Sequence, residues 1–219
     1  MRIFNESIYA RGTLGDAFMI VLKVLANRDK IKTINHFSKH DYAYPSIGKI
    51  YNLLEDIEVN FLKKPLREPC INGYLEPHET WEPHPVFQLP NIDKFNLPPK
   101  FNVVQLSSGL NQVWRKLKDG DLKRIPKTEK LVVLGTDTID APILKDYDCI
   151  DLRRSTALDE CLSIIAQAET FYGPQGLLSF FALSQKVKAN IFLKNEVDWQ
   201  AVKYRIGMIP EWQEHVQYY

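Results

Sequence analysis

The sequence predicts an α/β protein with two parallel sheets, one in each half of the chain. Short runs that are apolar throughout recur along the chain, segments with helical periodicity separate them, and several runs end at a glycine or at small polar residues. Strands without apolar–polar alternation are typical of parallel sheets buried on both faces, and helices between such strands supply the cover. We therefore expect two Rossmann-like domains with helices on both faces of each sheet.

Residues 100–195 show this pattern most clearly. A helix is expected from Thr156, with Leu158, Leu162 and Ile165 on its apolar face and Asp159 completing a capping-box-like start. A second helix is expected after Gly176. The strands expected in this half are residues 102–106, 130–134, 149–152, 170–172 and 189–193.

Residues 1–64 repeat the pattern on a smaller scale. A helix after Gly15 would turn Phe18, Leu22 and Leu25 inward, and another would follow near Ile47. The expected strands are residues 7–10, 32–37 and 59–62. This half is predicted to form the N-terminal Rossmann-like domain.

The remaining two segments connect or extend these domains. Residues 65–99 hold eight of the thirteen prolines, and proline restricts φ and removes a backbone donor. This stretch is predicted to be the crossing between domains and a loop over the cleft. Residues 196–219 are rich in aromatics and are predicted to form a helical tail that packs back on the N-terminal domain, or a partner-binding surface.

Composition excludes several classes of protein. A net charge of +1 excludes the global basic field of a nonspecific nucleic-acid-binding protein. The three cysteines lack CxxC spacing, and the histidines lack HExxH spacing, so we predict neither a disulfide framework nor a metal site. No apolar stretch approaches the length of about 20 residues that spans a bilayer. We expect a cytoplasmic protein with no cofactor and no transmembrane segment, in which peripheral membrane contact stays open.

The loop from Arg11 to Asp16 is the first candidate site. Gly12 and Gly15 allow a ligand to approach the backbone, and a helix N-terminus offers amide donors and a positive dipole end. Asp16 would lie in the first helical turn. Two interpretations are compatible with this position: Asp16 faces a ligand, or it only caps the helix.

Two further loops are suited to phosphate. Gly173-Pro174-Gln175-Gly176 lies between a strand and a helix, where backbone amides point outward. Ser107-Ser108-Gly109 also follows a strand, and Arg115 and Lys116 come soon afterwards. The alternatives are a tight turn for the first loop and a solvated basic helix face for the two cations.

Arg153 and Arg154 precede the helix that we expect to begin at Thr156. The arginines either meet phosphate or are solvated, and the solvated state is the commoner one for such a pair. Trp81, among the prolines, either stacks on a sugar ring or holds its own loop in place.

Taken in order, these segments resemble family-9 glycosyltransferases, the lipopolysaccharide heptosyltransferases and their relatives. Gly12-Thr13-Leu14-Gly15-Asp16 looks like the family's GxLGD loop. Asp151-Leu152 through Ala168 resembles its "DLxGxTSLxELxxLIxxAD" segment, and Gly173–Ser179 occupies the place of its "GxDSGxxH" loop. Val104–Gly109 with Trp114 is similar to the family's strand, small-residue turn and tryptophan. The resemblance covers roughly residues 7–193.

The resemblance implies the GT-B type of fold, in which two Rossmann-like domains face one another across a cleft. It implies metal-independent transfer of a hexosyl or heptosyl group from a nucleotide-diphosphate sugar to a glycan or lipid-linked saccharide, with Asp16 as general base. The donor side would be formed by Ser107, Ser108, Gly109, Arg115, Lys116, Thr156, Gly173, Gln175 and Gly176. The acceptor side would be formed by Arg11, Gly12, Thr13, Gly15 and Trp81.

The sequence departs from this family at three places. Pro174 stands where the family usually has Asp, Ser179 stands roughly where it has His, and the lysine before Trp114 is missing, so that only Arg115 or Lys116 could replace it. The alternative hypothesis is therefore a catalytically degenerate relative that acts as a binding or structural module.

Overall fold

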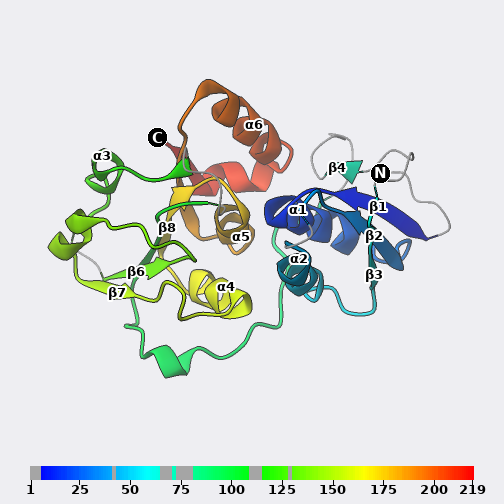
Figure 1. Ribbon diagram of the computed structural model, residues 1–219, viewed down its shortest axis with the longest axis horizontal. Coiled ribbons are helices and arrows are strands. Elements are labelled where there is room, and N and C mark those ends of the chain that lie inside the picture. Colours follow the sequence, from blue (N-terminus) through cyan, green and yellow to red (C-terminus); the bar gives the residue numbers. More distant parts are fainter. Residues whose placement is uncertain (1–5, 41–42, 65–70, 73–80, 109–114, 128–129) are drawn as a thin grey trace. The chain divides into compact units, whose positions relative to one another are not determined.

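The computed structural model describes residues 6–40, 43–64, 71–72, 81–108, 115–127 and 130–219 (Figure 1). Gly109, one of the predicted donor-site residues, and Trp114 lie outside the described residues. The chain divides into two compact units, Met1–Gln88 and Leu89–Tyr219. Each unit has a parallel sheet of its own, so the predicted α/β class is confirmed.

The first unit has a four-stranded sheet in the order β3-β2-β1-β4, and all pairings are parallel. Its three longer strands are the predicted ones, whereas β4 lies inside the proline-rich segment for which no regular structure was expected. The elements are β1 (Ser7–Arg11), α1 (Leu14–Leu25), β2 (Thr33–Phe37), α2 (Tyr44–Tyr51), β3 (Glu58–Phe61) and β4 (Ile71–Asn72).

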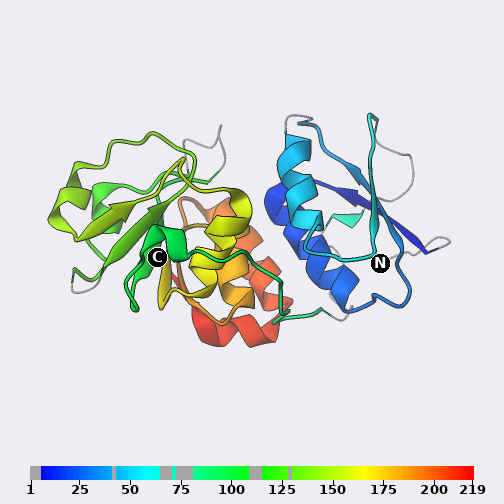
Figure 2. The ribbon, with the colours of Figure 1, turned by 90° about the horizontal axis from the view of Figure 1, so that it is seen from below.

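The described helices of this unit cover one face of the sheet, not two as predicted. Burial alternates along most of β1 and β2: Ile8, Ala10, Ile34 and His36 are buried, whereas Ser7, Tyr9, Thr33 and Asn35 are half-buried. Helices α1 and α2 pack against each other, and Figure 2 shows both on the same side of the strands. Right-handed crossovers from β1 to β2 and from β2 to β3 place their helices on one face, which explains the arrangement.

The second unit has a six-stranded sheet in the order β10-β9-β8-β5-β6-β7, and again all pairings are parallel. Its strands are β5 (Asn102–Gln105), β6 (Leu131–Leu134), β7 (Cys149–Asp151), β8 (Thr170–Pro174), β9 (Lys188–Phe192) and β10 (Val216–Tyr218). Its α-helices are α3 (Asp119–Leu122), α4 (Leu158–Ala166), α5 (Leu177–Ser184) and α6 (Glu196–Gly207). Short 3₁₀ helices are η2 (Asp93–Phe95), η4 (Pro142–Asp146) and η5 (Pro210–His215).

Both faces of this second sheet are covered, as predicted. Leu122 and Ile125, at and just after α3, pack with Tyr147 against Val104 and Val133 on one face. Helix α5 packs against β8 and β9. The central strands are consequently buried throughout, which explains why their sequences are apolar without alternation.

The division between the units differs from the predicted one. Residues 81–88 belong to the first unit, where Glu82 donates its backbone N–H to the Leu22 carbonyl. Residues from Leu89 onward belong to the second unit, where the Ser163 hydroxyl donates to the Pro90 carbonyl at 2.8 Å. The proline-rich segment is thus shared between the two units.

The C-terminal tail is an integral part of the second unit. Residues 196–219 form α6 and η5 and then strand β10, which pairs with β9, so the tail is not wholly helical as predicted. Trp212 is fully buried, and its ring stacks on Phe180 of α5. The docking of this tail on the first unit stays a prediction.

Both sheets reverse their strand order beside their first strand. In the second sheet, β6 and β7 lie on one side of β5, while β8, β9 and β10 lie on the other, which is the Rossmann order. In the first sheet, β2 and β3 lie on one side of β1 and β4 lies on the other. Open parallel sheets bind ligands at the carboxyl ends of the strands beside such a switch point.

Candidate functional site

The predicted loop of the first unit lies at its switch point. Arg11 ends β1, and Thr13, with an extended backbone, is the N-cap of α1. Gly12 has φ +134°, a conformation that favours glycine. A Cβ atom at position 12 would lie 2.3 Å from Asp16 Oδ2, so the glycine allows the loop to close on the Asp16 side chain.

The Asp16 carboxylate helps to cap the helix. Its Oδ2 accepts a hydrogen bond from the Thr13 backbone N–H at 2.8 Å and another from the Thr13 hydroxyl at 3.3 Å. No described residue donates to Asp16 Oδ1. One oxygen therefore holds the loop, and the half-buried carboxylate keeps a second oxygen for another partner. The two interpretations of Asp16 are compatible with each other.

His36 lies under this loop, and sequence reasoning did not select it. The imidazole is fully buried, with Nδ1 2.7 Å from the Tyr51 hydroxyl and Nε2 3.2 Å from the Gly12 carbonyl oxygen. Burial lowers the pKa of His36 and raises the pKa of Tyr51. The sequence did contain an indication of this burial. His36 follows the apolar Ile34 by two residues on the strand, so both side chains face the same side of the sheet.

Trp81 is not brought to this loop. Its ring lies under Lys23 Nζ, which is 4.6 Å from the ring centroid. Lys23 follows Asp16 by seven residues on α1, or about 10 Å along the helix axis. The structure thus places the predicted acceptor residues Arg11, Gly12, Thr13 and Gly15 at one end of α1 and Trp81 toward the other, where it holds its own segment against the helix.

The switch point of the second unit brings Ser108 next to Gly176. A Cβ atom at Gly176 would lie 3.4 Å from Ser108 Cβ and 3.9 Å from Ser108 Oγ. Gly176 is the N-cap of α5, and its N–H donates to the Ser179 hydroxyl. Ser108 is 7% exposed, and its hydroxyl has no hydrogen-bond partner among the described residues.

Ser107 is engaged differently from Ser108. Its hydroxyl donates to Asp137 Oδ2 at 3.3 Å, so the proton is already used. Ser107 also forms an isolated antiparallel bridge with Lys116, which brings residues 115–117 back beside the end of β5. Lys116 is exposed beside this serine turn, and the phosphate contact of Arg115 and Lys116 stays a prediction.

The Gln175 side chain points into α6 rather than toward a ligand. Its Nε2 donates to Asp198 Oδ1 at 2.7 Å, and its Oε1 accepts from Arg205 at 3.1 Å. Arg115 also pairs with Asp198 Oδ1, at 3.2 Å. This geometry does not support the predicted phosphate contact for the Gln175 side chain. Arg115 therefore pairs directly with the buried Asp198 carboxylate, and Arg205 is linked to it through Gln175.

Gly173 has a packing role in this loop. A Cβ atom there would lie 2.7 Å from the Phe171 ring and 3.2 Å from Gln105 Cβ. The glycine therefore allows the end of β8 to pass these side chains, which is the tight-turn interpretation.

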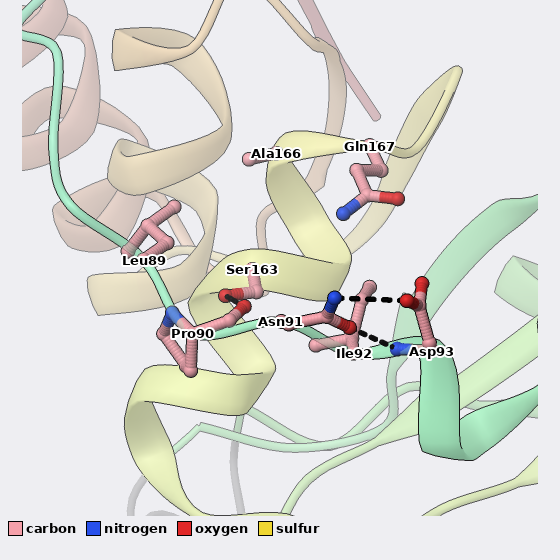
Figure 3. Close-up of a pocket in the computed structure, with 8 residues that line it drawn as sticks. All are labelled: Leu89, Pro90, Asn91, Ile92, Asp93, Ser163, Ala166 and Gln167. Atoms are coloured by element: carbon pink, nitrogen blue, oxygen red, sulfur yellow. Dashed lines mark hydrogen bonds between the residues drawn. The ribbon is translucent and has the colours of Figure 1, made fainter.

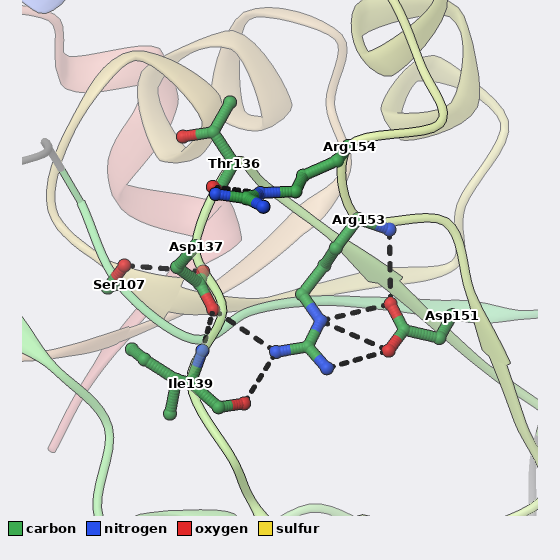
Figure 4. A network of polar contacts seen from close by, with 7 residues as sticks. All are labelled: Ser107, Thr136, Asp137, Ile139, Asp151, Arg153 and Arg154. Carbon is green, nitrogen blue, oxygen red and sulfur yellow. Dashed lines mark hydrogen bonds and ion pairs between the residues drawn. The ribbon is translucent and has the colours of Figure 1, made fainter.

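Arg153 belongs to a polar network at the ends of β6 and β7 (Figure 4). Its guanidinium donates to both oxygens of Asp151, to Asp137 Oδ1 at 3.2 Å and to the Ile139 carbonyl at 2.6 Å. These bonds lower the pKa of Asp151 and raise that of Arg153. The side chain is 17% exposed, so the expectation of a solvated Arg153 was wrong. Arg154 is exposed and donates to the Thr136 carbonyl.

Thr156 is not the helix N-cap that was expected. The cap of α4 is Ala157, whose N–H is accepted by Glu160 at 2.7 Å, one residue later than predicted. The Thr156 hydroxyl donates to the Leu152 carbonyl and lies 3.0 Å from Cys161 Sγ. Thr156 therefore stabilises the turn before α4, and its contact with a nucleotide stays a prediction.

A pocket of about 310 Å³ lies near the amino-terminal ends of the strands of this sheet (Figure 3). It is formed by residues 89–93 and by Ser163, Ala166 and Gln167 of α4. The carboxyl end of α4 leads into the start of β8, so the pocket is near the amino ends of the strands, away from Ser108 and Gly176.

The described part of the chain contains no group of three or more His, Cys, Asp or Glu side chains placed to hold a metal ion. Over the same residues, no helix combines the length and the apolar character that crossing a membrane requires.

The fold and the two loops define a protein of two Rossmann-like units, each with a polar loop at its switch point. No protein-family model matches the chain, and no curated protein matches it in sequence. Solved structures do match in fold. The glycosyl transferase family 9 protein from Veillonella parvula DSM 2008 aligns with a TM-score of 0.57 at 9% identity, over 87% of this chain and 82% of its own.

A second similar structure is the iron-containing dodecameric glycosyltransferase TibC from enterotoxigenic E. coli H10407, with a TM-score of 0.54 at 13% identity over 86% of this chain. The structure of TibC in complex with ADP-D-β-D-heptose gives 0.51 at 12% identity over 88%. This chain spans 58% and 59% of the two TibC chains. The resemblance to family-9 glycosyltransferases is thus confirmed at the level of the fold.

Proposed function

We propose that this protein is a metal-independent glycosyltransferase that moves a sugar from a nucleotide-diphosphate donor to a saccharide or glycolipid acceptor. The observation that carries the proposal is the position of the two loops. Gly12–Asp16 and the Ser108–Gly176 pair each lie at the carboxyl edge of a parallel sheet, beside its switch point. The ligand of the TibC complex, ADP-D-β-D-heptose, is a donor of this chemical class.

The donor diphosphate would bind at the second unit. The N-terminus of α5 offers backbone amides and a positive dipole end to an anion. The Ser108 hydroxyl beside it is a buried donor with no described partner, and such a group calls for a bound acceptor. Arg115, which pairs with Asp198, would be a further cation on the donor side. These groups would stabilise the charge that develops on the leaving diphosphate.

Asp16 would act as the general base in the first unit. Sugar transfer requires removal of a proton from the attacking hydroxyl of the acceptor, and a carboxylate close to that hydroxyl is suited to this role. Asp16 Oδ2 is held by Thr13, so Oδ1 is the oxygen that would accept the proton. The cap fixes the orientation of the carboxylate, which favours catalysis by positioning.

The two serines provide a matched test of the donor site. Calorimetric titration with ADP, UDP and GDP would identify the nucleotide, after which Ser108→Ala and Ser107→Ala would be compared. A hydrogen bond to a charged group contributes about 1.5–3 kcal/mol, so Ser108→Ala should weaken binding by about 10- to 150-fold. Ser107→Ala should leave affinity nearly unchanged, because that hydroxyl donates to Asp137.

Asp16→Asn tests the base. Asparagine retains an oxygen that can accept from the Thr13 N–H, so the loop should keep its shape while the negative charge is lost. Transfer should be abolished with donor affinity unchanged. Full turnover by Asp16→Asn would remove Asp16 from the role of base, whereas absence of nucleotide binding in the parent protein would favour the degenerate binding module.

A further inference from the structure

The buried imidazole of His36 has a single arrangement of its protons that satisfies both contacts. The Gly12 carbonyl can only accept, so Nε2, at 3.2 Å, must carry the proton. Burial lowers the pKa of His36, so the ring is neutral and Nδ1 is an acceptor. The Tyr51 hydroxyl, whose pKa is raised by burial, stays protonated and donates to Nδ1 at 2.7 Å.

The peptide group between Gly12 and Thr13 connects His36 to Asp16. The Gly12 carbonyl and the Thr13 N–H belong to one peptide unit, and that N–H donates to Asp16 Oδ2 at 2.8 Å. The donors therefore form a continuous series: Tyr51 to His36, His36 to the Gly12–Thr13 peptide, and the peptide to Asp16. Hydrogen bonds in series polarise one another, so each strengthens the next.

The elements that hold this series come from three parts of the first unit. His36 lies on β2, Tyr51 ends α2, and Asp16 lies in the first turn of α1. The imidazole is flanked by the rings of Tyr51 and Phe61, whose centroids lie 5.5 Å and 6.2 Å away. The ring has little room to turn, and the charge of Asp16 acts on both His36 and Tyr51.

We propose that His36 and Tyr51 are positioning residues that orient and polarise the Asp16 carboxylate through the Gly12–Thr13 peptide. The effect of this hydrogen-bond relay on catalysis rests on the proposed role of Asp16 as base. The hydrogen bonds of the relay themselves do not depend on that role. An apolar side chain at position 36 would fill the same space but would leave the Gly12 carbonyl without this donor.

The first test is spectroscopic and needs no substrate. Long-range ¹⁵N–¹H NMR should show His36 as the neutral Nε2–H tautomer. The Thr13 amide proton should resonate downfield of the random-coil position, because it donates to a charged acceptor. Asp16→Asn should move this resonance upfield, because the acceptor loses its charge. An Nδ1–H tautomer, or a Thr13 resonance that Asp16→Asn leaves in place, would overturn the relay.

Matched variants then separate the relay from packing. His36→Leu should move the Thr13 amide upfield, and His36→Gln should restore it, because the glutamine Nε2 can donate in place of the imidazole Nε2. Tyr51→Phe removes only one oxygen and replaces His36→Leu as the test variant if that protein fails to fold. Tyr51→Phe should also move the Thr13 amide resonance upfield. Identical Thr13 resonances in Tyr51→Phe and the parent would refute the proposal.

The kinetic readout connects the relay to catalysis. With a donor and an acceptor in hand, Tyr51→Phe should lower kcat about 3- to 10-fold, the effect of one neutral hydrogen bond, and leave the donor KM unchanged. A rise in donor KM at constant kcat would contradict the assignment. Full turnover by Asp16→Asn together with the expected NMR results would refute the proposed base while the relay stands.

Discussion

Replacing Gly12 by alanine should dislocate the loop that holds Asp16. Gly12 has φ +134°, and the added Cβ would lie 2.3 Å from Asp16 Oδ2 and 2.5 Å from Asp16 Cβ. The carboxylate could rotate away, but the Asp16 Cβ is fixed to the helix backbone. The alanine variant must therefore change its φ, move the first turn of α1, or do both.

The size of the effect follows from three contributions. A residue other than glycine in such a conformation costs about 1–3 kcal/mol, and loss of the Asp16–Thr13 cap costs about 1 kcal/mol. Alanine returns about 0.4–1 kcal/mol by restricting the unfolded chain. The free energy of unfolding of the first unit should thus fall by about 1–3.5 kcal/mol.

Native-state hydrogen exchange is the suitable assay, because it reports on each unit separately. The buried segment Ala17–Val24 of α1 supplies the probes. Gly48→Ala is the matched control, since Gly48 lies inside α2 and a Cβ there would meet Phe61 at an ordinary 3.7 Å. That control should gain about 0.5–1 kcal/mol.

This geometry predicts changes of opposite sign in the free energy of unfolding: a decrease for Gly12→Ala and an increase for Gly48→Ala. If Gly12→Ala left the protection of α1 equal to that of the parent, the reasoning about the loop would be refuted. Protection lowered by the same amount in both variants would also contradict it, because Gly48 has room for a methyl group.

Two further predictions concern charge. Arg153→Gln should lower stability at pH 7 by about 1–2 kcal/mol, discounted because Asp151 is half-exposed. The pKa of Asp151 is depressed in the folded protein, so its contribution is present above the unfolded-state pKa of 3.8 and is lost as the pH falls through the lower folded-state pKa; the gap between parent and variant in urea unfolding should therefore narrow as the pH is lowered below 3.8, and a constant gap would contradict this. Burial lowers the pKa of Lys23 from 10.5 to about 8, so the unfolded state binds more protons between these values and stability should rise from pH 7.5 to 9.5. Lys23→Met should lack that rise in denaturant titrations followed by tryptophan fluorescence, and an equal rise in both proteins would assign it to another group.

The strands and the two glycine loops were predictable because their signals are local. A short run with strand character is recognisable within a few residues, and eight of the described strands were expected from such local runs. Strands β4 and β10 were missed: β4 has two residues in a proline-rich segment, and β10 alternates polar and apolar residues at the edge of its sheet.

The partners of the polar side chains were less predictable. Ser107 and Ser108 are equivalent in the sequence, yet one donates to Asp137, thirty residues away, and the other is buried beside Gly176. Arg153 was expected to be solvated, but two carboxylates from neighbouring strand ends enclose it.

The sequence by itself therefore determined the α/β class, the order of the main strands and the position of the loops at strand ends, because these depend on periodicity and on glycine at particular turns. Tertiary structure alone decided which polar side chains meet. The relay from Tyr51 through His36 to Gly12 joins a helix, a strand and a loop that are brought together only when the parallel sheet assembles. A hydrogen bond depends on geometry within a few tenths of an ångström, and sequence spacing does not specify that geometry between distant elements.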